Sequence, residues 1–232
     1  MIIITDAHVS KIKGNDASFL KMLKALEKNS QDLIFLGDIF DLWIALPRYE
    51  DDIHREFISW CREQKKHRTI GYMAGNHEFY MTNERARAFT WYSQDAWQAG
   101  KEGILFVHGD QINRKDRKYL YFRILARSHI VKFIVRYLPL GPKVVEFIKE
   151  ELKKTNLEFR LGLPKEEIEF FAEARFAEGA ATIFVGHFHQ EYTYRNRESR
   201  ELHILPDWYR TQKVTVYRRN PKKITFLHWR EL

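Results

Sequence analysis

Five small clusters of carboxylate, imidazole and amide side chains recur along the chain, each directly after a short apolar run. They read Asp6-Ala-His8, Gly37-Asp38-Ile-Phe-Asp41, Gly75-Asn76-His77-Glu78, His108-Gly109-Asp110 and Gly186-His187-Phe-His189. Their potential ligand atoms are nitrogen and oxygen, a mixture that suits borderline divalent ions such as Mn²⁺, Fe²⁺ or Zn²⁺. They are too many for one tetrahedral structural zinc, whereas two ions that share a bridging carboxylate account for the number.

The spacing inside the clusters predicts how the side chains are aimed. Asp6 and His8 are two residues apart, as are His187 and His189, so on an extended chain we expect each pair to leave on one face. A glycine stands directly before the first ligand type in three of the clusters. A residue without a side chain lets the backbone turn tightly and keeps bulk away from the ligands.

The apolar runs predict the strands that position these clusters. They cover residues 2–5, 32–36, 69–73, 103–107 and 181–185, and segments of helical period such as 51–66 lie between them. Strands that alternate with helices predict an α/β fold with largely parallel pairing. Ligands gather at the carboxyl ends of such strands, so the five clusters should converge on one site. Three further strands after residue 200 are expected to pair antiparallel.

Residues from about 111 to 178 differ, with two or three helices and no convincing strand. We interpret them as a helical insertion in a single domain that spans residues 1–232. The stretch "KYLYFRILARSHIVKFIVRYL" predicts one helix that is apolar over more than half its circumference and basic elsewhere. Such a helix either packs on the domain or, as a lid, closes over acyl chains and meets an anionic membrane.

Composition bounds the function classes. The net charge of +8 favours an anionic partner, and no apolar stretch is long enough to span a membrane. The opening "MIIITDAH" has no basic leader, and the one cysteine, Cys61, cannot form an internal disulfide. We therefore expect a cytoplasmic protein.

Taken in order, D-x-H, G-D-x-x-D, G-N-H-E, H-G-D and G-H-x-H resemble the complete signature of the calcineurin-like metallophosphoesterases. The resemblance covers almost the whole chain and implies a four-layer α/β/β/α sandwich with a dimetal centre, for which we expect two Mn²⁺ ions, with Fe²⁺ or Zn²⁺ as the alternatives. It places one ion on the side chains of Asp6, His8, Asp38 and His189. It places the other on those of Asp38, Asn76, His108 and His187, so that Asp38 bridges.

Within that family the chain is most similar to a branch that cleaves UDP-2,3-diacylglucosamine in lipid A biosynthesis, giving UMP and 2,3-diacylglucosamine 1-phosphate. The similarity lies in the Trp of "GDIFDLW", the run "HGDQINRKDRKYLYFR" and the insertion after it, and it implies substrate contacts at Trp43, Asp116, Tyr119, Phe122 and Arg123. That branch usually has Arg after the Asn of G-N. Here His77 and Asp41 match the general phosphoesterase arrangement, in which the His contacts the scissile phosphate and the acid orients it.

The alternative is a phosphodiesterase or phosphatase of the same chemistry that acts on another substrate, such as a nucleotide or nucleic acid. The charge permits this, although we find no nucleic-acid motif and expect no specific nucleic acid. A binding scaffold that has lost catalysis is not expected, because every ligand position is filled. The expected partners are a small or lipid-linked nucleotide and the inner face of an anionic membrane, with no protein partner.

Overall fold

The computed structural model describes residues 1–99, 103–158 and 162–232, so residues 159–161 of the predicted insertion lie outside the described part. The strands are β1 (Ile2–Ile4), β2 (Leu33–Leu36), β3 (Trp43–Ile44), β4 (Ile70–Met73), β5 (Glu78–Phe79), β6 (Trp91–Ser93), β7 (Trp97–Ala99), β8 (Ile104–Val107), β9 (Thr182–Val185), β10 (Tyr192–Arg195), β11 (Glu201–Ile204), β12 (Lys213–Arg218) and β13 (Lys223–His228). The helices are α1 (Asp16–Leu26), α2 (Asp52–Gln64), α3 (Asn83–Ala86), α4 (Arg117–Ala126), α5 (His129–Tyr137), α6 (Gly141–Glu158), α7 (Lys165–Ala177) and α8 (Trp208–Thr211), with 3₁₀ turns at Pro47–Tyr49 and Trp229–Glu231.

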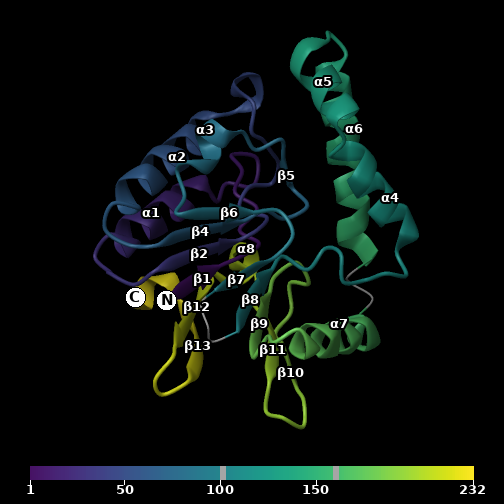
Figure 1. Cartoon of the computed structure of the whole chain (residues 1–232). Coiled ribbons are helices and arrows are strands. Elements are labelled where there is room, and N and C mark those ends of the chain that lie inside the picture. The colour runs from purple at the N-terminus through teal and green to yellow at the C-terminus, as the bar shows by residue number, and fades with distance from the viewer. Residues whose placement is uncertain (100–102, 159–161) are drawn as a thin grey trace.

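Two mixed sheets form the centre of the described molecule (Figure 1). The first has the order β13-β12-β1-β2-β4-β6, and the second has the order β10-β11-β9-β8-β7. In the first sheet β1, β2, β4 and β6 run parallel, and in the second β8, β9 and β11 do. Strands β3 and β5 pair separately as a short parallel ribbon.

Three apolar clusters show how the elements are stacked. Helices α1 and α2 cover the outer face of the first sheet, where Phe19 and Phe57 are fully buried against Phe35. The inner faces of the two sheets meet through a second cluster that joins Ile34 to Phe184. Helix α7 covers the outer face of the second sheet. The elements thus follow the order helix, sheet, sheet, helix in Figure 1, and burial of these faces is the main favourable term in folding.

The predicted α/β class and the five predicted strands are confirmed. The runs expected at residues 2–5, 32–36, 69–73, 103–107 and 181–185 correspond to β1, β2, β4, β8 and β9. The antiparallel expectation after residue 200 holds for β12 and β13 and holds in part for β11, which pairs antiparallel with β10 but parallel with β9. The sequence pattern missed β3, β5, β6, β7 and β10, because such short edge strands carry too few residues for a clear alternation.

The helices of the predicted insertion divide into two groups. Helix α7 belongs to the sandwich, whereas α4, α5 and α6 project beside it and bury Val135, Ile148 and Leu152 against the β3–β5 ribbon (Figure 1). The prediction of one continuous amphipathic helix after residue 117 is wrong, because the segment forms two helices, α4 and α5. Helix α4 ends at Ala126, and α5 begins after Ser128, whose side chain caps it by accepting a hydrogen bond from the Val131 amide. Among the described helices, none is both long and apolar enough to cross a membrane.

His54 on α2 should make stability depend on pH. Its ring packs against the rings of Phe40 and Trp43, and burial lowers its pKa from 6.5 to about 4. The unfolded chain therefore takes up this proton at a higher pH than the folded chain does. The stabilising contribution is complete above pH 6.5 and is lost as pH falls toward 4. We expect a loss of about 2 kcal/mol between about pH 7.5 and about pH 5 from this group alone.

The measurement is urea unfolding at both pH values with a chelator present, for the unaltered protein and for His54→Asn. Asparagine keeps an acceptor for the Asp51 amide, which donates to His54 Nδ1 at 3.1 Å, but it does not titrate. The variant should lose less stability on acidification. Equal losses in the two proteins would show that His54 is not the group responsible.

Candidate metal centre

The loops that follow β1, β2, β4, β8 and β9 meet at one place, although the strands belong to different sheets. The Asp6 amide donates to the Gly37 carbonyl at 3.0 Å, and the His8 amide donates to the Asp38 carbonyl at 2.9 Å. Within the second sheet, the Gly186 amide donates to the His108 carbonyl at 2.9 Å, and between the two sheets the His187 amide donates to Asp6 Oδ2 at 2.8 Å. Parallel strands end at the same edge, and these bonds hold the five clusters together there.

The backbone at the candidate ligands is not extended. Left-handed φ angles occur at Asp6 (50°), His8 (42°), Asp38 (52°), His187 (68°) and His189 (52°). The expectation that Asp6 with His8, and His187 with His189, leave one face of an extended chain is therefore wrong. The loop turns sharply at each residue and aims its side chain individually. Non-glycine residues rarely adopt this conformation, and such strain concentrates at functional sites.

Asp38 lies at the centre of the cluster. Its Oδ2 is 3.4 Å from His108 Nε2, 3.7 Å from His77 Nε2 and 3.9 Å from His8 Nε2. His189 Nε2 is 3.4 Å both from His8 Nε2 and from Asp6 Oδ1. Three groups could hold a metal ion: Asp6 with His8 and His189, His8 with Asp38 and His77, and Asp38 with His108 and His187. The Oδ1 atom of Asn76 lies 3.1 Å from His108 Nε2, beside the last group.

Three of the imidazoles around Asp38 are in the form that binds metals. Burial lowers the pKa of His187 to about 3 and that of His189 to about 4, and it lowers the pKa of His8 well below its ordinary value. These rings are neutral near pH 7 and keep a free lone pair. Burial also lowers the pKa of His108, but the carboxylates of Asp38, Asp6 and Asp110 together outweigh it and raise the pKa to about 10. A metal ion at His108 must therefore displace a proton.

Two observations test whether the residues fit metal ions. Among the described residues, Asp6 Oδ1 and His77 Nε2 are buried polar atoms without a hydrogen-bond partner, which costs free energy unless a ligand satisfies them. The glycines make room for the ligands, as expected. A Cβ at Gly37 would lie 2.3 Å from His108 Nδ1, and one at Gly75 would lie 2.2 Å from Asp38 Oδ1. The donor set and its packing fit divalent cations.

The orientation of His77 depends on the backbone of Asp41 and not on its carboxylate, which corrects the expectation above. His77 Nδ1 lies 2.5 Å from the Asp41 carbonyl oxygen, so Nδ1 is the donor of that bond and Nε2 faces Asp38. The Asp41 carboxylate turns away, is 30% exposed and pairs with Lys13 Nζ at 2.6 Å. The chain turn at Asp41 brings its carbonyl, rather than its side chain, under the ring.

Glu78 was given no role by the sequence, and the structure shows that it organises the centre. Its buried carboxylate accepts hydrogen bonds from the amides of Asp38 (3.0 Å), Ile39 (2.9 Å) and Gly75 (2.7 Å) and from the Tyr72 hydroxyl (3.1 Å). It thereby joins the loop after β2 to the loop after β4. The available signal was its place at the end of G-N-H-E, where a carboxylate could be a ligand or a backbone acceptor.

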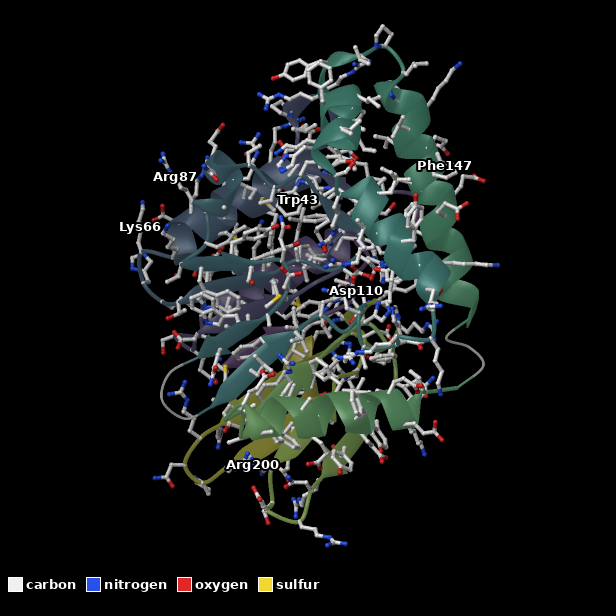
Figure 2. All side chains as sticks on the ribbon, turned by 45° about the vertical axis from the view of Figure 1, so that its right-hand side comes forward. Trp43, Lys66, Arg87, Asp110, Phe147 and Arg200 are labelled. Carbon is white, nitrogen blue, oxygen red and sulfur yellow. The ribbon has the colours of Figure 1, made fainter. Side chains whose placement is uncertain are left out.

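The residues expected to contact substrate are held mainly by the protein itself. The prediction that Trp43 contacts substrate is wrong, because its side chain is 0% exposed and donates a hydrogen bond to Glu50 in the interior (Figure 2). Asp116 caps α4 by accepting from the Tyr119 amide at 2.9 Å. The Tyr119 hydroxyl is buried and donates to Asp110 at 2.7 Å, so it can donate to substrate only by breaking that bond.

The two remaining residues lie on α4. Arg123 Nε donates to the Asp110 carboxylate at 2.7 Å. Phe122 is half-buried, packs on the cluster under α4–α6 and contacts the Phe147 ring at 6.5 Å between centroids. In Figure 2 Asp110 lies toward α4, at the ends of the strands, and Phe147 lies on α6. Contact of Phe122 or Arg123 with substrate stays a prediction.

The sequence profile of the calcineurin-like phosphoesterases matches residues 1–191. The chain belongs to this family. As a calcineurin-like phosphoesterase it is a metal-dependent hydrolase, and the family implies a dimetal centre. A relative named UDP-2,3-diacylglucosamine hydrolase, from Shewanella loihica, is 24% identical over 236 residues that cover 96% of this chain and 93% of the relative. One of the same name from Azotobacter vinelandii is 26% identical over 227 residues, 90% of each chain.

Solved structures of phosphoesterases also resemble this chain. A predicted phosphoesterase from Streptococcus pneumoniae aligns with a TM-score of 0.46 and 12% identity over 99% of this chain and 88% of its own. A dimetal phosphatase from Danio rerio aligns with a TM-score of 0.45 and 13% identity over 92% and 91%.

Proposed function

We propose that the chain hydrolyses the pyrophosphate of UDP-2,3-diacylglucosamine and releases UMP and 2,3-diacylglucosamine 1-phosphate. The observation that carries this proposal is an apolar surface on α4–α6 beside a candidate dimetal centre. The names of the relatives support it, because the two proteins described above are each called a hydrolase of this lipid-linked nucleotide. Attack on the phosphate next to uridine yields both products without breaking a sugar bond.

In this proposal the ligands divide between two cations around Asp38. One ion is assigned to Asp6, His8, Asp38 and His189, and the other to Asp38, Asn76, His108 and His187. Two Mn²⁺ ions would supply a hydroxide nucleophile near neutral pH and would polarise the phosphate oxygens. Nitrogen and oxygen donors also suit Fe²⁺ or Zn²⁺, so metal analysis of the purified protein must identify the native ions.

His77 is proposed to act on the phosphate and not on the metals. Its Nδ1 is held by the Asp41 carbonyl, and its Nε2 points into the centre 3.7 Å from Asp38 Oδ2. An imidazolium in this orientation has one N–H free for a phosphate oxygen. It can stabilise charge that develops there, or it can pass its proton from Nε2 to the leaving oxygen.

Binding of the substrate's acyl chains is assigned to α4, α5 and α6, the helices that project beside the sandwich. Large apolar side chains are exposed on all three helices, including Ile130 (74% exposed), Phe133 (55%) and Phe147 (56%). An exposed apolar patch of this kind marks a binding surface. Helix α4 also contacts the metal-centre loop through Arg123 and Asp110, so the patch lies near the candidate reaction site.

The acyl chains should therefore raise kcat/KM. Each buried methylene contributes about 0.8 kcal/mol, so kcat/KM should rise steeply from a deacylated to a long-chain UDP-sugar. Phe133→Asp should flatten this dependence, because a carboxylate opposes burial of the chain. The measurement is kcat/KM for substrates with no, short and long acyl chains, with Mn²⁺ and UMP release as the signal.

The matched control is Phe170→Asp, which alters a 61% exposed phenylalanine on α7, outside the three helices. It should preserve the chain-length dependence. If the unaltered protein cleaves the deacylated substrate as well as the long-chain one, the helices do not recognise lipid. The protein would then be a general phosphodiesterase of the kind that acts on nucleotides, a reading favoured by the presence of His77 where the lipid branch usually has Arg.

The same surface supports peripheral contact with an anionic membrane on the cytoplasmic side. Ile130 and Phe133 lie on α5, and Lys132 lies between them in the chain. Apolar side chains with neighbouring cations bind the interface of anionic bilayers. Sedimentation with vesicles of anionic and neutral lipid tests this part of the proposal, which predicts binding to the anionic vesicles alone.

A further inference from the structure

Helix α4 presents three polar side chains to the loops that hold the candidate ligands. Tyr119, Arg123 and Arg127 follow one another at intervals of four residues, so they lie on one side of the helix. The first two donate to one oxygen of Asp110, each at 2.7 Å, two residues after His108. The near end of α4 is thus attached to the loop after β8.

Arg127 attaches the far end of α4 to the loop after β4. Its Nη2 donates to the Gly75 carbonyl at 2.5 Å and lies 3.4 Å from the Glu78 carbonyl. These two carbonyls flank Asn76 and His77 in the chain. The Tyr80 hydroxyl donates in the opposite direction, to the carbonyl of Ala126. The contact is therefore reciprocal and involves both sides of the loop.

The bonded carbonyls belong to the loop that carries two side chains facing the metal centre. The Gly75 carbonyl has one other donor among the described residues, the Glu78 amide at 3.4 Å, which is a long bond. Asn76 and His77 come next in the chain. Asn76 Oδ1 lies 3.1 Å from His108 Nε2, and the His77 amide donates to Asp38 Oδ1 at 2.9 Å. A guanidinium that holds the first carbonyl limits rotation of the peptides that carry both residues.

We propose that Arg127 is a positioning residue that acts through the loop of Asn76 and His77 and couples the docking of α4 to hydrolysis. The inference rests on the proposed role of His77. The bonds of Arg127 are to backbone carbonyls of the protein, so its effect extends to any phosphodiester, with or without acyl chains. A residue that bound only the lipid or its headgroup would leave a small diester unaffected.

The test is steady-state hydrolysis of bis-p-nitrophenyl phosphate with Mn²⁺ by Arg127→Met and Arg127→Lys. Both variants keep an alkyl stem beside the Phe79 ring, over which the guanidinium lies at 5.9 Å. Loss of a charged hydrogen bond predicts a fall in kcat of about 10- to 100-fold in Arg127→Met, with KM and bound metal nearly unchanged. Arg127→Lys should recover part of the rate, because its ammonium can reach one carbonyl.

The matched control is Arg117→Met, on the same helix, where the exposed guanidinium bonds none of the described residues. Its kcat should equal that of the unaltered protein. In a double variant with His77→Ala, the loss due to Arg127→Met should shrink, because the group it positions is gone.

Normal kcat in Arg127→Met, or losses that multiply fully in the double variant, would overturn the inference. Normal kcat in His77→Ala alone would instead refute the role proposed for His77. A fall in kcat accompanied by an equal fall in bound metal would also overturn the inference, since Arg127 would then support ligation and not the reacting loop. Thermal unfolding of each variant identifies any that fails to fold, and Arg127→Lys then carries the comparison.

Discussion

Asp38→Ala is expected to remove activity and most of the bound metal together. Its carboxylate is proposed to bridge both ions, and its Oδ2 lies within 3.9 Å of ring nitrogens from His8, His77 and His108. Alanine leaves the remaining ligands of each ion without their shared anion. The two cations would then lie beside three imidazoles without the carboxylate that offsets their charge. The measurements are metal content by elemental analysis and turnover with added Mn²⁺.

Two further variants separate the charge from its structural contacts. Asp38→Asn keeps an acceptor for the His77 amide, which donates to Asp38 Oδ1 at 2.9 Å, but removes the charge. It should lose metal nearly as completely as Asp38→Ala. Asp52→Ala alters an exposed carboxylate at the start of α2 and should change neither quantity. The bridging assignment is wrong if Asp38→Ala keeps both ions and near-normal turnover.

His77→Ala is expected to lower kcat by about 10²–10⁴-fold, the usual contribution of an acid–base group, while metal content stays the same. The reason is its orientation: Nδ1 is bonded to the Asp41 carbonyl, and Nε2 faces the centre without a partner among the described residues. If the ring donates a proton to the leaving group, aryl phosphates with very acidic leaving groups should lose less. Measurements of kcat on good and poor leaving groups distinguish proton donation from charge stabilisation.

Asp41→Asn is the control for this interpretation. The substitution keeps the backbone carbonyl that orients His77 and removes only the carboxylate that pairs with Lys13. We expect a much smaller loss of kcat than in His77→Ala. A loss as large as that of His77→Ala would restore the carboxylate as the orienting group. Equal losses of His77→Ala on good and poor leaving groups would exclude the proton-donor role.

The parts that the sequence predicted well depend on neighbouring residues. Each strand is a compact apolar run, and the candidate ligands directly follow it, so a few adjacent letters carry both signals. The convergence of clusters within each sheet also followed, because parallel strands end at one edge, whereas the packing of the two sheets brings both sets together. The order of the motifs led to the family, which the match over residues 1–191 shows.

Tertiary structure decided the features that depend on backbone dihedrals and distant partners. The sequence alone could not show that the carbonyl of Asp41, and not its carboxylate, meets His77, because that follows from one turn of the chain. Trp43 was expected to contact substrate, but the packing of α2 and the first sheet buries it. Tyr119 and Arg123 bond Asp110 because the fold places α4 against the loop after β8. The sequence by itself determined which residues can do the chemistry, whereas long-range packing determined which of their atoms face the centre.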